Sequence, residues 1–370
     1  NELPLGETKL MAELARKIER NAKYILWAII GLFVSKKNPP PLPINFTALT
    51  SVLVIRPDRL GDVVLSTPVY ESIKKSFPHL HLSVVVSQDN VPILIGNPNI
   101  DKIIPFEPKN IGTAIKQLRN TKFDIAFTLN KKFSAIASIL SLISKAKYKI
   151  SYAHDETAWL YDIRLPLDNQ LRHESLNNLE LLNYVGLPSI TKSPCLYFNK
   201  DEEKKITIML NALRKYPKRP LVLIKPGTRI EQWGWKEGNF RIVAEKLSSL
   251  KQAEVLFICG PGEEPLINRI NKQANPKIGQ LPILSIKELA LVIKKSDLLF
   301  CNHTGIMHFA SAVETPAVVI FKHGEVSRWG PISIPHIVLE EKNSDTLSPE
   351  IVLKKINQLL ANTTKNNKTI

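Results

Sequence analysis

Short runs rich in β-branched residues alternate with helical stretches over most of the chain, in two successive series. Such alternation is typical of βαβ units, which form a parallel sheet with helices on both faces. In the first series the runs are Ser51 to Arg56, Leu82 to Ser87, Asp101 to Pro105, Asp124 to Leu129 and Lys147 to Tyr152. In the second they are Leu221 to Ile224, Glu254 to Cys259, Leu298 to Cys301 and Ala317 to Phe321. We therefore predict an α/β protein with two Rossmann-like domains.

The chain divides into four segments around these series. A length of 370 residues agrees with two domains at roughly 150 residues each. We expect an amino-terminal amphipathic helix and Pro-rich linker over 1–48, a first domain over 49–199, a second over 200–347, and a carboxyl-terminal helix and tail over 348–370. The charged residues Lys200 to Lys205 and Lys215 to Arg219 mark the expected hinge region.

The composition narrows the class of partner. The chain carries 50 Lys and Arg against 34 Asp and Glu, a net charge of +16, which favours an anionic partner. The basic residues are scattered and follow no nucleic-acid-binding motif, so we expect no nucleic-acid partner. The motifs G-x-G-x-x-G, G-x-x-x-x-G-K-[ST] and G-x-S-x-G are absent, which disfavours nicotinamide enzymes, P-loop NTPases and α/β-hydrolases. The three cysteines stand far apart and predict neither a disulfide framework nor a zinc site.

The amino-terminal segment combines helical periodicity with basic charge. Apolar residues recur at helical spacing opposite a set of cations, which are Lys9, Arg16, Lys17, Arg20 and Lys23. The apolar run from Tyr24 to Val34, which includes Trp27, is too short to span a bilayer. Either this helix lies in an anionic membrane interface, or it packs on the protein's own body.

The first candidate site follows the first strand, in the stretch R-P-D-R-L-G-D-V-V-L-S-T-P from Arg56 to Pro68. Open α/β folds bind their ligands at the carboxyl ends of the strands, where these charged residues are expected to lie. Gly61 allows a tight turn, and Asp62 opens the next helix. On the residues alone, Asp62 is either a functional carboxylate or a helix-stabilising one at a helix N-terminus.

The second candidate site follows the first strand of the second series, from Lys225 to Phe240. Gly227 and Thr228 leave backbone N–H groups accessible at a strand end, and three cations, Lys225, Arg229 and Lys236, follow within the same stretch. This combination suits a diphosphate. The two tryptophans of the loop either stack on a ligand ring or pack between helix and sheet.

The third candidate site is the stretch C-N-H-T-G-I-M-H-F-A-S-A from Cys301 to Ala312. Thr304 and Gly305 stand where a strand gives way to a helix, a natural anion site. His303 and His308 are five residues apart without a third ligand nearby, so we expect no metal. The G-P-G-E-E stretch that begins at Gly260 forms a similar turn into a helix.

These motifs in this order resemble glycosyltransferase family 9, the family of ADP-heptose:lipopolysaccharide heptosyltransferases. The resemblance also rests on R-H-E-x-x-x-N-L-x-L-L at Arg172 to Leu182 and on R-W-G-P at Arg328 to Pro331. It implies a GT-B fold, with two parallel sheets facing a central cleft. It implies inverting, metal-independent transfer of a sugar, typically from ADP-heptose, to a lipid-linked saccharide, without a cofactor, and Asp62 matches the family's catalytic aspartate. This raises the functional interpretation of Asp62 above the structural one.

The resemblance places the donor in the second domain and the acceptor in the first. The expected donor-binding residues are Lys225, Gly227, Thr228, Arg229, Lys236, Gly260, Thr304, Gly305, His308 and Glu325. The chain departs from the family pattern at three places: Trp233 stands where the family has a lysine, His303 where it has an acidic residue, and Lys322 to Val326 where it has G-P-T-D-P. Glu325 either replaces the aspartate of that loop or is an ordinary surface residue.

The expected acceptor-binding residues are Arg59, Gly61, Lys131 and Lys132, which suit the carboxylates or phosphates of a lipid-linked anionic saccharide. With the basic amino-terminal helix, they favour a peripheral protein on the cytoplasmic side of the inner membrane. Two alternatives remain at this point. One is a GT-B-like sugar-nucleotide epimerase or hydrolase, and the other is a non-catalytic sugar-nucleotide-binding protein.

Overall fold

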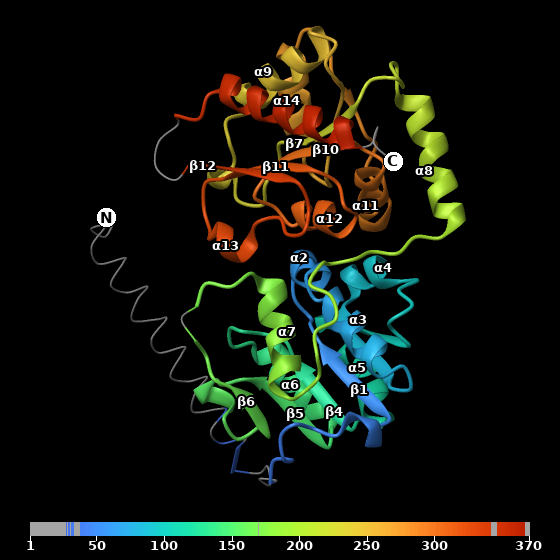
Figure 1. Ribbon diagram of the computed structural model, residues 1–370, viewed down its shortest axis with the longest axis vertical. Helices are drawn as coiled ribbons and strands as arrows, with labels where there is room; N and C mark the ends of the chain where they lie inside the picture. Colours follow the sequence, from blue (N-terminus) through green and yellow to red (C-terminus); the bar gives the residue numbers. More distant parts are fainter. Residues whose placement is uncertain are drawn as a thin grey trace, which may run out of the picture.

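The computed structural model describes residues 38–168, 170–341 and 346–366, with Trp27, Ile29, Gly31 and Leu32 of the preceding segment. It contains two six-stranded sheets in which every strand pair is parallel. Each sheet belongs to one of two domains stacked along the long axis of the molecule (Figure 1). The predicted α/β class with two Rossmann-like domains is confirmed.

The first domain has the strand order β3-β2-β1-β4-β5-β6. Its strands are β1 (Ser51–Ile55), β2 (His81–Ser87), β3 (Lys102–Phe106), β4 (Ile125–Thr128), β5 (Tyr148–Tyr152) and β6 (Ile163–Leu165). Its helices are α2 (Leu60–Val64), α3 (Thr67–Ser76), α4 (Val91–Leu94), α5 (Ile111–Arg119), α6 (Ala135–Ser144) and α7 (Glu174–Tyr184). The central strands β1 and β4 are almost wholly buried because helices cover both faces of the sheet.

The second domain has the strand order β12-β11-β10-β7-β8-β9. Its strands are β7 (Leu221–Lys225), β8 (Glu254–Phe257), β9 (Gly279–Gln280), β10 (Leu298–Asn302), β11 (Ala317–Phe321) and β12 (His336–Glu340). Its helices are α8 (Lys200–Leu213), α9 (Glu237–Ser249), α10 (Glu264–Gln273), α11 (Ile286–Lys294), α12 (Met307–Ala312), α13 (Val326–Trp329) and α14 (Pro349–Asn366). The edge strands β6, β9 and β12 lie outside the runs predicted from the sequence.

The connection between the domains differs from the expected hinge. The charged residues 200–205 form the first turns of α8, because Asn199 and Glu202 make reciprocal hydrogen bonds that begin the helix. The preceding stretch 187–199 contains no helix or strand, and it carries the chain from α7 to α8 (Figure 1). Gly186, with φ of 90°, ends α7 in the left-handed conformation.

The two sheets bring their carboxyl edges together at the boundary between the domains. The loop after β1 leads into α2, the loop after β10 leads into α12, and these two short helices contact each other. Figure 1 shows α2 at the edge of the first domain, directed toward α12 and α13 of the second. The strand ends that carry the first and third candidate sites therefore meet.

The predicted amino-terminal helix falls almost entirely outside the described residues. Of its described residues, Trp27 is buried, with its ring 5.9 Å from the rings of both Phe133 and Trp159. At this position the segment packs on the first domain. Over the residues that the structure describes, no helix combines the length and apolar character needed to cross a membrane.

Candidate active site between the two domains

The first structural element of the site is Arg56, which directly follows β1. Its side chain is 2% exposed, and its guanidinium donates to the Leu129 carbonyl at 2.6 Å, to Asp62 at 2.9 Å and to Glu174 at 3.0 Å. Its Nε lies 3.2 Å from the Asp58 carboxylate. A buried charge is tolerated only when it is paired, so these carboxylates and Arg56 hold one another in place. Although burial opposes the charged form, the carboxylates raise the pKa of Arg56 above its usual value.

Asp62 lies in the first turn of α2, at the edge of this cluster. Its side chain is 16% exposed, so it is neither enclosed in the first domain nor fully in solvent. Burial is the main cause that raises its pKa, and the carboxylates of Asp58 and Glu174 add to the rise, while Arg56 opposes it. A carboxylate with a raised pKa is a stronger proton acceptor once it is ionised.

The helix start of the second domain lies directly against α2. A Cβ atom on Gly61 would lie 2.7 Å from Cδ2 of His308, and one on Gly305 would lie 3.7 Å from the Gly61 nitrogen. Gly61 is therefore required for the close approach of the two domains. Burial lowers the pKa of His308 to about 3, with His173 and His303 adding to the effect, so the imidazole is neutral.

Two buried polar atoms at this helix start have no hydrogen-bond partner among the residues that the structure describes. They are Oγ1 of Thr304 and Nδ1 of His308. Buried polar groups are usually hydrogen-bonded, and an unpaired one carries a desolvation cost. Both atoms are therefore candidates for contact with a ligand.

Glu263, which is not among the predicted site residues, joins the loops after β7 and β8. Its carboxylate pairs with the ammonium of Lys225 and accepts a hydrogen bond of 2.8 Å from the backbone of Gly260. A Cβ atom on Gly227 would lie 2.6 Å from Nζ of Lys225. The predicted residues Lys225, Gly227 and Gly260 are thus brought together, but Lys225 is 6% exposed and already paired.

The remaining predicted donor-binding residues differ in exposure. Thr228 is half-buried, while Arg229, Lys236, Gly305 and Glu325 are exposed. The three departures from the family pattern are adjacent: the Trp233 ring lies 5.3 Å from that of His323, and Nδ1 of His303 lies 2.9 Å from the His323 carbonyl oxygen. Trp233, His303 and His323 therefore form an aromatic surface where the family pattern has a lysine and acidic residues.

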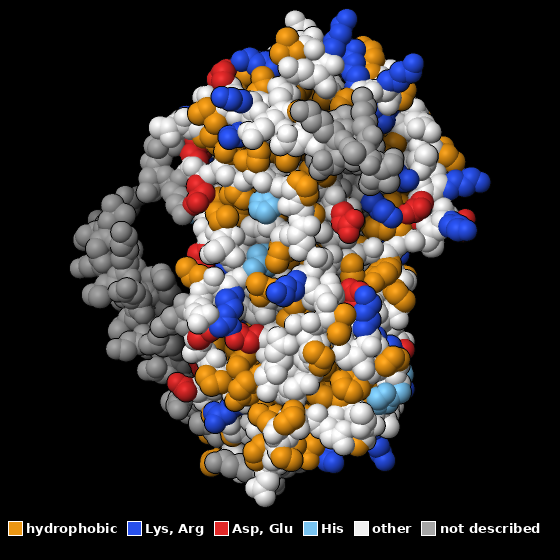
Figure 2. All heavy atoms as spheres, viewed as in Figure 1, with side chains coloured by type: hydrophobic (Ala, Val, Ile, Leu, Met, Phe, Trp, Pro, Cys, Tyr) orange, Lys and Arg blue, Asp and Glu red, His pale blue; other side chains and the backbone are white. Residues whose placement is uncertain are grey.

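The predicted acceptor-binding residues lie on the first domain. Lys131 is largely buried and donates to Asp168 at 3.0 Å and to Asn177 at 3.3 Å. Arg59 and Lys132 are exposed, and Gly61 is buried against the second domain. On the face drawn in Figure 2, Lys and Arg side chains are spread over both domains with Asp and Glu among them.

Two further charged residues at the site, Glu174 and Arg328, are not among the predicted site residues. Glu174 begins α7 and is 3% exposed in its side chain, and Arg328 of α13 donates to it from Nε at 3.1 Å and from Nη2 at 2.9 Å. Close by, Nε2 of His173 lies 2.9 Å from the carbonyl oxygen of Gly330. The motifs R-H-E and R-W-G-P contain these residues, so the resemblance was the signal that could have found them.

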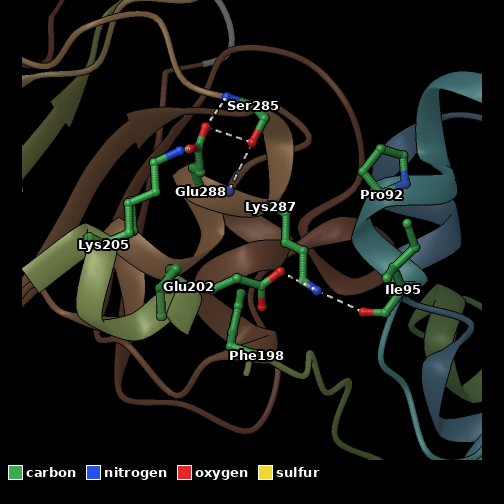
Figure 3. Close-up of a pocket in the computed structure, with 10 residues that line it drawn as sticks. Pro92, Ile95, Phe198, Glu202, Lys205, Ser285, Lys287 and Glu288 are labelled. Atoms are coloured by element: carbon green, nitrogen blue, oxygen red, sulfur yellow. Dashed lines mark hydrogen bonds and ion pairs between the residues drawn. The ribbon is translucent and has the colours of Figure 1, made fainter. Parts of the chain in front are cut away.

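A pocket of about 490 Å³ lies elsewhere between the domains, where α4 faces α8 and α11. Figure 3 shows Lys287 reaching from α11 between Glu202 and the carbonyl of Ile95, to which it donates at 2.8 Å. None of the predicted site residues lines this pocket. Among the described residues, no three His, Cys, Asp or Glu side chains form a group that could hold a metal ion.

Comparisons with known proteins agree with this architecture. The model of glycosyltransferase family 9 (heptosyltransferase) matches residues 111–357. Lipopolysaccharide heptosyltransferase 3 of Escherichia coli is 26% identical over 289 residues, which cover 74% of this chain and 84% of that protein. The lipopolysaccharide core heptosyltransferase OpsX of Haemophilus influenzae is 25% identical over 300 residues, which cover 78% of this chain and 84% of that protein.

Solved structures share the fold. A family 9 glycosyltransferase from Veillonella parvula superimposes with a TM-score of 0.78 at 22% identity, covering 85% of this chain and 98% of that chain. The ADP-heptose lipopolysaccharide heptosyltransferase II of E. coli gives a TM-score of 0.71 at 19% identity, covering 85% of this chain and all of that chain. The fold is therefore GT-B. Since the family model matches most of the sequence, the chain belongs to glycosyltransferase family 9.

Proposed function

We propose that this glycosyltransferase moves a heptose from ADP-heptose onto a hydroxyl of a lipopolysaccharide core saccharide, with inversion and without a metal ion. The observation that carries the proposal is the position of Asp62: a partly exposed carboxylate of raised pKa, in the helix of the first domain that contacts the helix start of the second. The names of the lipopolysaccharide heptosyltransferases of E. coli and H. influenzae support the heptose and the acceptor, and that of the ADP-heptose heptosyltransferase II of E. coli supports the nucleotide.

Asp62 acts in this proposal as the general base. Arg56 binds its Oδ1, so Oδ2 takes the proton from the acceptor hydroxyl. The hydroxyl oxygen forms a bond to the anomeric carbon while the bond from that carbon to the diphosphate breaks, and the bonding electrons leave with ADP. Because attack and departure take place on opposite sides of the carbon, the configuration inverts.

The second domain supplies the groups that stabilise the departing diphosphate. Oγ1 of Thr304 and Nδ1 of His308 are buried and unpaired, and a neutral imidazole with a proton on Nδ1 donates to a phosphate oxygen. Arg229 and Lys236 are exposed in the stretch after β7 and add positive charge to this domain. Preorganised donors of this kind stabilise developing negative charge in a transition state.

The acceptor is proposed to approach along the first domain, where Arg59 and Lys132 are exposed cations. The basic amino-terminal segment would hold the protein on the anionic inner-membrane surface, where lipid-linked acceptors reside, since each such cation near the surface contributes about 1 kcal/mol. Sedimentation with anionic vesicles tests this. Equal binding by a variant with Lys9, Arg16, Lys17 and Arg20 changed to Gln would contradict it.

The expected result for the donor is selective use of ADP-heptose. The full chain should transfer heptose to a truncated lipopolysaccharide core and release ADP in equal amount, and ADP-heptose should raise the melting temperature more than UDP-, GDP- or CDP-linked sugars. Consumption of ADP-heptose at the same rate without acceptor would contradict transfer and indicate a hydrolase or epimerase. A stronger response to another nucleotide would overturn the donor assignment, with Trp233 and His303 as the first residues to examine.

A further inference from the structure

The carboxylate of Glu174 is shared between the two domains. One oxygen accepts from Arg56 of its own domain at 3.0 Å, and the other accepts from Arg328 of the second domain at 2.9 and 3.1 Å. Figure 1 shows α13, which carries Arg328, facing α7, which begins at Glu174. Arg56 in turn binds Asp62 at 2.9 Å. A continuous chain of charged groups therefore runs from the second domain to the proposed base.

The four linked side chains, Arg328, Glu174, Arg56 and Asp62, are buried enough for their charges to interact strongly. The side chains of Arg56 and Glu174 are 2% and 3% exposed, and those of Arg328 and Asp62 are 17% and 16% exposed. Charges in such surroundings are screened less by solvent and salt than surface charges. The state of one member therefore affects the protonation of the next.

We propose that Arg328 is a positioning residue through which contact between the domains keeps Asp62 ionised. The proposal rests on the proposed function of Asp62 as the base. With Arg328 docked, the charges around Asp62 balance, because Arg56 and Arg328 offset Asp58 and Glu174. When the domains separate, Arg328 leaves, and the uncompensated carboxylate of Glu174 favours the protonated form of Asp62. The base is then ready only when the donor-binding domain is in place.

Neutral groups complete the surroundings of Asp62 and Glu174. His308 of α12 lies against Gly61, the residue before Asp62, and burial lowers the pKa of His308 to about 3. His173 precedes Glu174 and contacts Gly330, and burial lowers its pKa as well. Burial opposes ionisation of Glu174, but the two guanidiniums overcome it and hold its pKa below the usual value. Near neutral pH the network thus consists of the four charged groups and Asp62.

The test is the pH dependence of kcat/KM for transfer in Arg328→Gln, Glu174→Gln and the double variant. Removal of the positive charge of Arg328 leaves Asp62 in surroundings of net negative charge, which raises its pKa. The acidic limb of the kcat/KM profile of R328Q should therefore move to higher pH. At one pH unit below the wild-type midpoint, its rate relative to its own plateau should fall about threefold, which corresponds to half a pH unit. The limb of E174Q should move to lower pH. In the double variant the charges balance again, so the midpoint should return close to the wild-type value.

A purely structural role for the pair predicts a different pattern. If the ion pair of Glu174 with Arg328 only holds the domains together, its loss lowers transfer equally at all pH values. The double variant then behaves like the worse of the single variants. Either unchanged midpoints or failure of the second substitution to restore the R328Q midpoint would overturn the proposal. Arg328→Lys keeps the charge and should keep the wild-type midpoint, even if it lowers the plateau.

Direct titration separates this proposal from that of the transfer reaction. The pKa of the Asp62 carboxyl can be followed by carbon NMR in protein labelled at aspartate, with the signal assigned from Asp62→Asn. It should rise in R328Q and fall in E174Q whether or not the substrate assignment is right. If the wild type shows no transfer, the proposed function fails; if it transfers but this pKa is the same in all variants, only the present inference fails.

Discussion

The Asp62→Asn variant should transfer sugar at least about 100 times more slowly than the wild type, since a positioned general base contributes 10²- to 10⁴-fold. Asparagine has nearly the same shape and retains an oxygen that can accept from Arg56, but it takes up no proton. The fall should therefore appear in kcat, while the melting-temperature rise caused by the donor is preserved. Measurement of both quantities on the same preparation separates loss of chemistry from loss of binding.

Asp58→Asn is the matched control for this experiment. It makes the same change in the same loop, next to the same arginine, at a carboxylate that pairs with Arg56 at 3.2 Å and accepts from Asn130 at 2.8 Å. Asp58 takes up no proton in the proposed reaction and only adds to the rise in the pKa of Asp62. At a pH above the acidic limb its variant should therefore retain transfer within about tenfold of the wild type, the scale of losing one hydrogen bond. Transfer by D62N at the level of D58N would remove Asp62 from the mechanism.

The Arg56→Met variant should lose about 3–5 kcal/mol of unfolding free energy, the usual result of removing one partner from a buried ion pair. Asp62 would lose its charged partner, and Glu174 would keep only Arg328. Urea denaturation measures the loss. Arg56 lowers the pKa of both carboxyls, so in its absence they take up protons at a higher pH than in the wild type. As the pH falls through that range, protonation relieves the repulsion between them, and the difference from the wild type should shrink.

Arg269→Met provides the comparison at an exposed ion pair. Arg269 pairs with Glu237 at 2.6 Å, but the two side chains are 57% and 40% exposed. Exposed pairs contribute about 0–1 kcal/mol, so this variant should denature nearly as the wild type does. Similar losses in R56M and R269M would show that the cluster around Arg56 does not hold the site together.

The fold was predictable from the sequence because its determinants are local. The β-branched runs 51–56 and 221–224 predicted β1 and β7, because parallel strands that are buried on both faces consist of such runs. The edge strands were harder. Strand β9 has two residues, both exposed, so it carries no burial pattern. The start of α8 was missed although its capping residues, Asn199 and Glu202, have the spacing that predicts a helix start.

The site was predictable in part. Asp62 and Gly61 follow a strand directly, and topology alone places them at the ligand-binding edge. The partners of the charged residues were not predictable, because they are distant in the sequence: Arg56 and Glu174 are 118 residues apart, and Glu174 and Arg328 are 154 apart. Lys225 illustrates the consequence. The sequence shows Lys225 as a cation close to a glycine, whereas in the structure its buried ammonium pairs with the partly exposed carboxylate of Glu263.

The central claim is that the carboxylate of residue 62 meets the acceptor hydroxyl where the two domains touch. The most direct test is a crystal structure of Asp62→Asn with intact ADP-heptose and the acceptor saccharide, a complex that the slow variant should preserve. The acceptor hydroxyl should lie about 2.6–3.2 Å from the side chain of residue 62, on the face of the anomeric carbon opposite the diphosphate. A reacting hydroxyl bound beyond reach of this side chain, with another group in contact with it, would contradict the account.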